Sequence, residues 1–293
     1  MIRFLIMMFL VILVSCGSDD AFVLDQSASA PITACAKEND RINLEAIIDD
    51  LFWSDYLDLV NVREIRNSKS TGQIRIPTIN ASCTAFLVND NTIMTNNHCV
   101  PNQTYAKGVL FFLRAENQSR ETYLCEKLLA TNSNLDFSLL ECEGYPGEKY
   151  GSIPLSLTVP TKDQNMYLVQ ENCNYLGEPR CLVHKYLAKG KIHRVSLSSL
   201  SHDADTLGGS SGSPIFNQDT HELVGIHHAG MAKSGSTPAM NFGIPMHRIA
   251  KHLFDHYPEI SISLSTATQD HDDDLLAHCT SGKDSSTVDN LSK

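Results

Sequence analysis

The sequence predicts an all-β fold that is followed by a single C-terminal helix. Between residues 71 and 257, short runs rich in β-branched and aromatic side chains alternate with Gly, Asn, Asp and Pro, the pattern of a β-sandwich or β-barrel. These runs cover residues 85–88, 92–95, 109–113, 137–142, 166–169, 192–195, 214–216, 223–226 and 240–244. Residues 245–257 then place Ile249, Leu253 and Phe254 on the inner side of an amphipathic helix.

The composition is that of a globular protein. The chain has 293 residues, of which 42% are hydrophobic and 19% charged. Its formal net charge is −11 and no basic stripe with interleaved aromatic residues occurs, so nucleic acid is not an expected partner. His247, His252 and His256 recur at helical spacing, as in a surface stripe, and His271 stands in an Asp-rich tail. We expect no cofactor or metal, and a monomer is the default.

The N-terminus has the features of an export signal. Arg3 precedes an unbroken apolar run at residues 4–14, which is too short to cross a bilayer that takes roughly 20 helical residues. The run ends in Leu13-Val14-Ser15-Cys16-Gly17, which resembles a bacterial lipobox with Cys16 as the lipidated residue. We expect a periplasmic or cell-envelope lipoprotein, or a protein secreted after processing, that meets membrane only through this anchor. An ordinary signal peptide with a cysteine at its cleavage site is the alternative.

Four segments are expected along the chain. They are a signal peptide with lipobox (1–16), a tether and leader or pro-segment (17–70), the main domain (71–257) and an acidic, flexible tail (258–293). Within the leader, residues 43–65 show helix-like apolar spacing and contain Trp53, the only tryptophan. Both a pro-segment and a helix packed on the domain fit this pattern.

The cysteines predict a disulfide framework. Apart from Cys16 the chain has Cys35, Cys83, Cys99, Cys125, Cys142, Cys173, Cys181 and Cys279, an even number behind an export signal. Local spacing favours Cys83–Cys99, Cys125–Cys142 and Cys173–Cys181, and elimination leaves Cys35–Cys279. A zinc site is the competing use of these residues, but no two cysteines have the C-x2-C spacing.

Three stretches contain residue types that together suit serine-dependent hydrolysis. They are Thr95-Asn96-Asn97-His98-Cys99, Asn134-Leu135-Asp136-Phe137-Ser138, and Gly208-Gly209-Ser210-Ser211-Gly212-Ser213-Pro214. A serine attacks a carbonyl only when a histidine accepts its proton and a carboxylate orients that histidine. Backbone N–H groups must also stabilise the oxyanion, each by about 2.7–4 kcal/mol. Glycines before the serine permit the tight turn that aims two N–H groups at one point.

These stretches resemble the His, Asp and Ser motifs of the chymotrypsin/trypsin-like serine proteases, in that family's chain order. The resemblance covers about residues 71–257 and implies two six-stranded antiparallel β-barrels with a C-terminal helix. It implies His98 as general base, Asp136 as its orienting acid and Ser211, rather than Ser210 or Ser213, as nucleophile. It also implies the N–H groups of Gly209 and Ser211 as the oxyanion hole. The family's disulfide beside the catalytic histidine joins cysteines 16 positions apart, as Cys83 and Cys99 are.

The motifs are most similar to the bacterial glutamyl endopeptidase (V8-like) branch. That resemblance implies that Thr206 and His227 bind the carboxylate of a Glu or Asp at substrate position P1, the residue before the cleaved bond. His228 and Ala229 depart from the branch, which has Trp and Gly there. The branch also uses a mature N-terminal amino group, which requires a cut in the leader. Asp205 lies near the position where trypsins hold the aspartate that selects basic residues, so a basic or small P1 residue stays open.

Three functions are therefore compared. The first is an exported serine endopeptidase that acts on protein or peptide substrates. The second is a catalytically inactive homologue that serves as a surface binding module. The third is a zymogen that is activated by a cut in an exposed linker near Arg63, Arg66 and Lys69.

Overall fold

The computed structural model describes residues 46–48, 51–114, 119–173, 183–232 and 239–265. The signal peptide, the tether up to residue 45 and the tail beyond residue 265 lie outside the described residues. Cys16, Cys35, Cys181, Cys279 and the side chain of Cys173 also lie outside them, so the lipidation site and two of the four disulfides stay predictions. No helix within the described ranges is long and apolar enough to cross a membrane.

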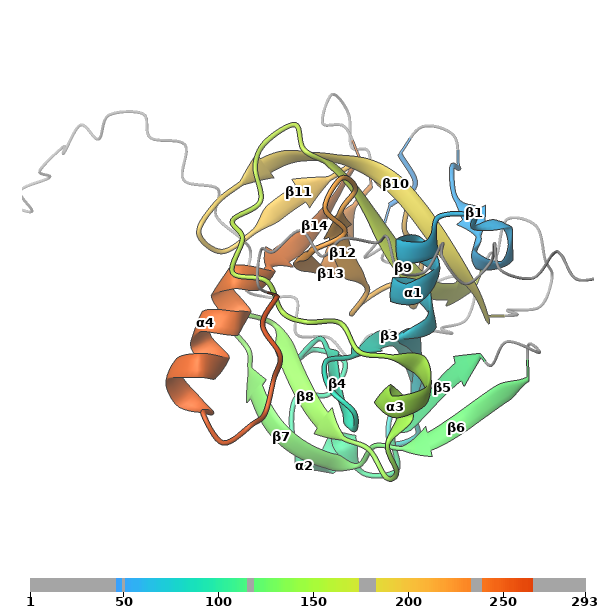
Figure 1. Ribbon diagram of the computed structural model, residues 1–293, viewed down its shortest axis with the longest axis vertical. Helices are drawn as coiled ribbons and strands as arrows, with labels where there is room; N and C mark the ends of the chain where they lie inside the picture. The colour runs from blue at the N-terminus through green and yellow to red at the C-terminus, as the bar shows by residue number, and fades with distance from the viewer. Residues whose placement is uncertain (1–45, 49–50, 115–118, 174–182, 233–238, 266–293) are drawn as a thin grey trace, which may run out of the picture. The chain divides into compact units, whose positions relative to one another are not determined.

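The second half of the chain forms a closed antiparallel barrel of six strands (Figure 1). In barrel order the strands are β9 (Asn165–Cys173), β10 (Val183–Val195), β11 (Leu200–His202), β14 (Met240–Pro245), β13 (Leu223–Met231) and β12 (Pro214–Asn217). β12 pairs with β9, which closes the ring. A short seventh strand, β1 (Ser54–Asp55), pairs with β10 on the outside of this order.

The first half of the chain forms a seven-stranded antiparallel sheet. Its order is β6 (Arg120–Leu124), β5 (Leu110–Arg114), β2 (Thr71–Ile76), β3 (Ala81–Leu87), β4 (Thr92–Thr95), β8 (Phe137–Glu141) and β7 (Lys127–Asn132). The two-barrel prediction is thus confirmed, but this half has seven described strands where six were expected, and no pairing among them closes it. The described strands β6 and β7 form the two edges of the sheet, and only Cys125 and Glu126 separate them. The chain itself therefore joins the two edges that a closed barrel would join by hydrogen bonds.

Apolar side chains of both sheets pack into one cluster that also receives the last helix, α4 (Met246–His256). Phe86 and Met94 come from the first sheet, and Tyr167 and Phe216 from the barrel. Such burial stabilises by about 25 cal/mol per Å² of apolar surface.

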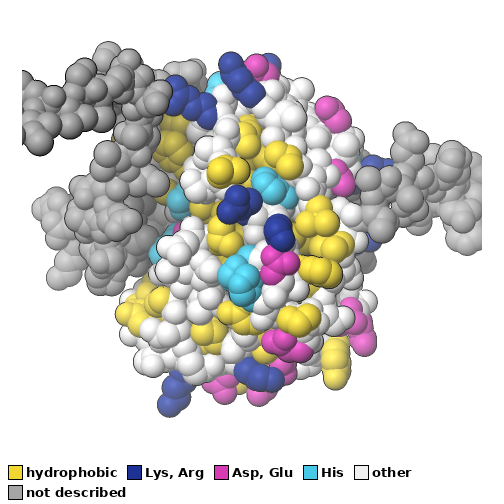
Figure 2. Space-filling view, turned by 90° about the vertical axis from the view of Figure 1, so that its left-hand side faces the viewer, with side chains coloured by type: hydrophobic (Ala, Val, Ile, Leu, Met, Phe, Trp, Pro, Cys, Tyr) yellow, Lys and Arg dark blue, Asp and Glu magenta, His cyan; other side chains and the backbone are white. Residues whose placement is uncertain are grey.

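The predicted C-terminal helix is confirmed as α4. Figure 2 views the molecule from the side on which α4 lies in Figure 1, and histidine, basic and acidic side chains occur together on that face. Ile249 and Leu253 are buried as expected. The expected inward position of Phe254 is wrong, because its side chain is 72% exposed. Met246 and Ala250 complete the buried face at helical spacing instead.

The leader residues 51–70 pack against the barrel. Trp53 stacks on Tyr186 of β10 with ring centroids 4.6 Å apart. After a 3-10 turn (Tyr56–Asp58), helix α1 (Val62–Lys69) begins where the Asn61 side chain accepts the N–H groups of residues 63 and 64. The helix-like spacing over 43–65 therefore misplaced the helix. The expected exposed linker is also wrong, because Arg63, Arg66 and Lys69 all lie in α1. Two further short helices are α2 (Gln103–Ala106) and α3 (Pro146–Tyr150).

A buried ion pair joins the leader to strands β9 and β10 of the barrel. It lies next to residues 208–213, the turn that contains Ser211. Lys185 Nζ of β10 lies 3.8 Å from Glu171 Oε1 of β9 and donates to the carbonyl of Ser68 in α1 at 2.7 Å. Both charged side chains are at most 2% exposed. Burial lowers the pKa of Lys185 to about 8, against the Glu171 carboxylate that raises it. Burial likewise raises the pKa of Glu171.

We predict that Lys185→Met lowers the free energy of unfolding by about 3–5 kcal/mol, because it removes the ammonium group that lies 3.8 Å from the buried Glu171 carboxylate. The measurement is urea unfolding at pH 7, read from the transition midpoint. The double variant Lys185→Met with Glu171→Leu should recover most of the loss, since no charge is then buried. A loss below about 1 kcal/mol in the single variant would contradict the role of the pair.

Candidate active site

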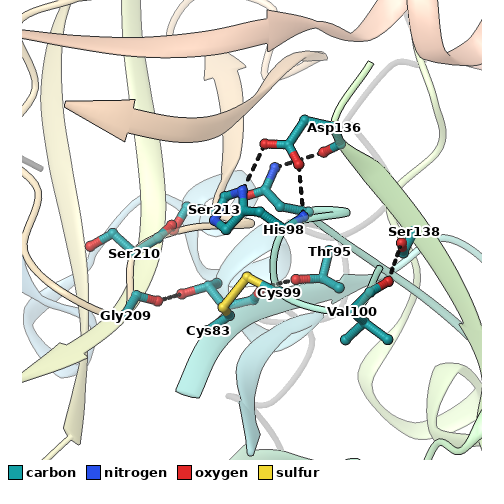
Figure 3. The surroundings of a disulfide bond; sticks show 12 residues. Cys83, Thr95, His98, Cys99, Val100, Asp136, Ser138, Gly209, Ser210 and Ser213 are labelled. Carbon is teal, nitrogen blue, oxygen red and sulfur yellow. Dashed lines mark hydrogen bonds and ion pairs between the residues drawn. A yellow bond between two sulfur atoms is a disulfide. The ribbon is translucent and has the colours of Figure 1, made fainter. Parts of the chain in front are cut away.

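His98 and Asp136 meet because the strands that precede and follow them are paired. Thr95 at the end of β4 pairs with Ser138 of β8, so the turn after β4 faces the turn before β8. His98 Nδ1 lies 2.8 Å from Asp136 Oδ2, and the backbone N–H of His98 donates to Asp136 Oδ1 at 2.9 Å. Figure 3 shows both bonds. The Asn96 side chain also donates to the Asp136 backbone carbonyl at 2.9 Å. The carboxylate is thereby fixed at both oxygens.

Asp136 is held ionised by its neighbours. Burial alone raises the pKa of Asp136, but the charge and hydrogen bonds of His98 and His228 outweigh it and hold that pKa well below its usual range. Asp136 also has a left-handed backbone with φ of 41°, a conformation that aspartate tolerates better than most residues. The side chain is 14% exposed. It is a carboxylate suited to orienting an imidazole.

Two disulfides hold the first sheet. Cys83 of β3 is bonded to Cys99, the residue after His98, and Cys125 is bonded to Cys142. These are two of the expected pairs. The first one fixes the turn that carries His98 to the adjacent strand (Figure 3).

The three serines of the serine loop, residues 208–213, have different environments. Ser210 is fully buried, donates to the Gln170 side chain, and receives bonds from the N–H of Leu207 at 3.2 Å and from Asn172 at 3.3 Å. The Ser213 hydroxyl is fully buried and donates to the Ser210 carbonyl at 2.6 Å. Ser211 is the one of the three that reaches solvent, with 8% of its surface exposed. The hydroxyls of Ser210 and Ser213 thus hold the turn together.

Two glycines allow the serine loop to lie against its neighbours. Gly212 has φ of 89°, and a Cβ there would lie 2.1 Å from the Thr84 carbonyl oxygen and 2.6 Å from Thr95 Oγ1. Gly209 has φ of 107°, and a Cβ there would lie 3.0 Å from the Glu171 carbonyl oxygen. Any larger residue would move the loop away from β3 or β9.

Hydrogen bonds fix the serine loop to both sheets. The N–H of Thr84 in β3 donates to the Ser211 carbonyl at 2.8 Å, and Thr84 Oγ1 donates to the Gly209 carbonyl at 2.9 Å. The N–H of Gly212 donates to the carbonyl of His227 in β13 at 2.9 Å. The serine loop is therefore positioned at the junction between the sheet that carries His98 and the barrel.

The two residues expected to recognise P1 lie in the barrel wall. His227 and Thr206 are both fully buried. His227 Nδ1 lies 3.2 Å from Nε2 of His202, and burial, followed by His228 and His98, lowers the pKa of His227 to about 3. Thr206 Oγ1 donates to Asn241 Oδ1 at 2.9 Å, and its N–H donates to the Ala46 carbonyl at 3.1 Å. His227 is thus neutral at pH 7, and both Thr206 donors are engaged within the protein.

Leader residues form part of the same wall. The Asn241 side chain accepts the Ala46 N–H at 3.0 Å and donates to the Ala46 carbonyl at 2.7 Å. The Asp205 carboxylate, 3% exposed, accepts the N–H of Ile48 at 2.7 Å and of Phe52 at 2.6 Å. Asp205 therefore fastens the leader to the barrel through both of its oxygens.

Sequence reasoning did not anticipate the contacts that four residues make in this site. His228 Nδ1 lies 3.3 Å from Asp136 Oδ2, and His202, Asn241 and Asp205 support the wall as described above. His228 had a sequence signal, since it stands next to His227 where the resembling branch has tryptophan. His202 and Asn241 come together only through strand register, because they are paired residues of β11 and β14. Within the described ranges no group of three or more His, Cys, Asp or Glu side chains is placed to hold a metal ion.

A sheet and a barrel of antiparallel strands, with a His–Asp pair on one and a Gly-Ser turn on the other, have the architecture of the trypsin-like two-barrel fold. Residues 83–226 of this chain match the trypsin-like peptidase domain family. The match includes His98, Asp136 and Ser211.

Other proteins are similar at lower identity. A curated relative, Secreted RxLR effector protein 73 of Plasmopara viticola, is 24% identical over 169 residues, which is 50% of this chain and 41% of that protein. The chain thus spans less than half of that relative's length. A solved Glu endopeptidase has a TM-score of 0.59 and 22% identity, over 73% of this chain and 99% of that one. Neuropsin from mouse brain has a TM-score of 0.51 and 15% identity, over 65% of this chain and 95% of that one. These structures share the fold.

We predict that Gly212→Ala lowers the free energy of unfolding by at least about 2 kcal/mol, from left-handed strain together with overpacking against Thr84. The measurement is urea unfolding of the purified variant. Gly208→Ala is the matched control, because a Cβ at Gly208 meets nothing within 4 Å. Equal stability of the two variants would show that the serine loop does not need its close approach to β3.

Proposed function

We propose that this protein is an exported serine endopeptidase with Ser211 as nucleophile, His98 as general base and Asp136 as orienting acid. The observation that carries the proposal is the Asp136 carboxylate bound to the backbone N–H and to Nδ1 of His98, together with a serine loop in which Ser211 is the solvent-accessible serine. The two disulfides are consistent with export to an oxidising compartment. A lipid anchor at Cys16, a cleaved leader and a monomeric state remain parts of the proposal.

The reaction follows from these positions. As Ser211 Oγ attacks the substrate carbonyl, His98 Nε2 takes the hydroxyl proton, and Asp136 stabilises the imidazolium through Nδ1–H. The N–H groups of Gly209 and Ser211 are the proposed donors to the oxyanion, in a turn that the left-handed Gly209 shapes. Collapse expels the amine with the proton from His98. Water then repeats the steps and releases the acid from the acyl-enzyme.

An acidic P1 residue is the proposed preference, with His227 as the principal donor. If His227 Nδ1 accepts from His202, its proton is on Nε2, and a neutral N–H can bind the carboxylate without a buried cation. Thr206 contributes less, because its hydroxyl proton is already directed at Asn241. A basic P1 residue is disfavoured, because both Asp205 oxygens accept leader N–H groups.

We predict that Ser211→Ala reduces peptide hydrolysis by about 10⁴-fold or more, since the nucleophile is lost. The measurement is cleavage of a mixed peptide library followed by mass spectrometry, with the N-terminus of the purified protein determined. Ser213→Ala is the control and should retain cleavage. Absence of cleavage by the native protein, with every leader form tested, would favour the inactive binding module.

We predict that His227→Leu lowers kcat/KM for a Glu-P1 peptide by about 10- to 100-fold relative to its Gln-P1 analogue, the value of one hydrogen bond to a charged group. Thr206→Val should change the same ratio less than His227→Leu does. The measurement is steady-state hydrolysis of the two peptides at pH 7. Serine-dependent cleavage that favours Lys or Arg at P1 would contradict the acidic preference and leave the protease proposal intact.

A further inference from the structure

Two histidines contact the same carboxylate oxygen. Asp136 Oδ2 lies 2.8 Å from His98 Nδ1 and 3.3 Å from His228 Nδ1. The two side chains from different elements thus converge on one acceptor, with His228 25% exposed. In the reaction proposed above only His98 transfers a proton, so the second imidazole has no assigned role.

An irregularity in the barrel aims His228 at this oxygen. In the β13–β14 pairing His227 lies opposite Gly243 and Ala229 opposite Phe242, so His228 is the extra residue of a β-bulge. A regular strand would direct consecutive side chains to opposite faces. The bulge changes the direction of the strand locally, as bulges next to active sites commonly do. At this bulge His227 is buried in the wall, and His228 reaches Asp136.

We propose that His228 is a positioning residue of this site, which fixes the Asp136 carboxylate against His98. Through this contact the proton affinity of His98 also responds to the charge of a second imidazole. The proposal rests on the proposed protease function. With His228 the carboxylate is within reach of three N–H groups, two on Oδ2 and the His98 backbone N–H on Oδ1. Three such contacts leave it no freedom to rotate away from the imidazole that it must orient.

The charges around His228 determine the sign of the pH effect. It faces Asp136 and His98 from the first sheet, and it interacts electrostatically with His227 and His202 within the barrel. The latter two are buried, and burial lowers the pKa of each, so they are neutral at pH 7. A proton on His228 repels one on His98, and removing the His228 imidazole removes that repulsion. The pH below which activity falls, which follows protonation of His98, then becomes higher. This part of the pH profile is called the acid limb below.

The kinetic test compares His228→Leu with His228→Asn, whose amide N–H occupies about the position of Nδ1 but does not titrate. We expect kcat to fall about 10- to 100-fold in the leucine variant with KM within about twofold, since an orienting hydrogen bond to a charged group is lost. The asparagine variant should restore kcat to within a few-fold, with its acid limb at higher pH than in the native protein. His256→Asn, at the exposed end of α4, is the control and should change neither. If His228→Leu had the kcat of the native protein and an acid limb at the same pH, the proposal would be overturned.

A second measurement does not depend on hydrolysis and separates this proposal from the protease function. In full-chain protein with ¹⁵N-labelled histidine, we expect the Nδ1 resonance of His228 at pH 7 to shift on Asp136→Asn, because that nitrogen lies 3.3 Å from Asp136 Oδ2 and loses its charged partner. Ser211→Ala should leave that resonance unchanged. If peptide hydrolysis is never found, this result still supports the contact. An unchanged His228 Nδ1 resonance in Asp136→Asn overturns the proposal even in an active enzyme.

Discussion

The site depends on one buried threonine that joins the two halves of the fold. Thr84 donates its N–H to the Ser211 carbonyl and its hydroxyl to the Gly209 carbonyl, and its carbonyl accepts Thr95 Oγ1 at 2.8 Å. Its hydroxyl also accepts the N–H of Glu171 at 3.0 Å. The N–H, the carbonyl and the hydroxyl of Thr84 are all hydrogen-bonded, so the position of this residue is fixed from several directions. The serine loop is thereby fixed relative to His98, which follows Thr95 by three residues.

The charges around Asp136 favour a protonated imidazole at His98. Asp136 is the carboxylate shared by His98 and His228, and its depressed pKa keeps it ionised. Behind them, burial is the largest cause that lowers the pKa values of His227 and His202. Since these two imidazoles stay neutral at pH 7, they add no positive charge that would oppose an imidazolium at His98. A low-dielectric wall strengthens the remaining attraction between carboxylate and imidazolium.

Local chemistry in the sequence predicted the fold class and the His98–Asp136 pair, because both depend on short motifs. Strands such as β2 and β6 were not predicted, since Gly72 and Gln73 in β2 and the charged residues of β6 are poor strand formers that are held in strands by their neighbours. Contacts that depend on strand register, such as those of Asn241 with Ala46 and Thr206, have no local signal. The helix in the leader was misplaced because apolar spacing was weighed above the capping residue Asn61.

One polar network connects the leader to the serine loop. Asp205 accepts two leader N–H groups through its carboxylate, and its carbonyl accepts Gln170 Nε2 at 2.9 Å. Gln170 Oε1 in turn accepts the hydroxyl of Ser210, the residue before Ser211. Buried networks are stable only when each member keeps its partner, so release of the leader would leave the Asp205 carboxylate without those two donors. The described leader residues therefore belong to the folded unit, and a pro-segment cut that preserves this wall has to leave Ala46, Ile48 and Phe52 attached to the domain.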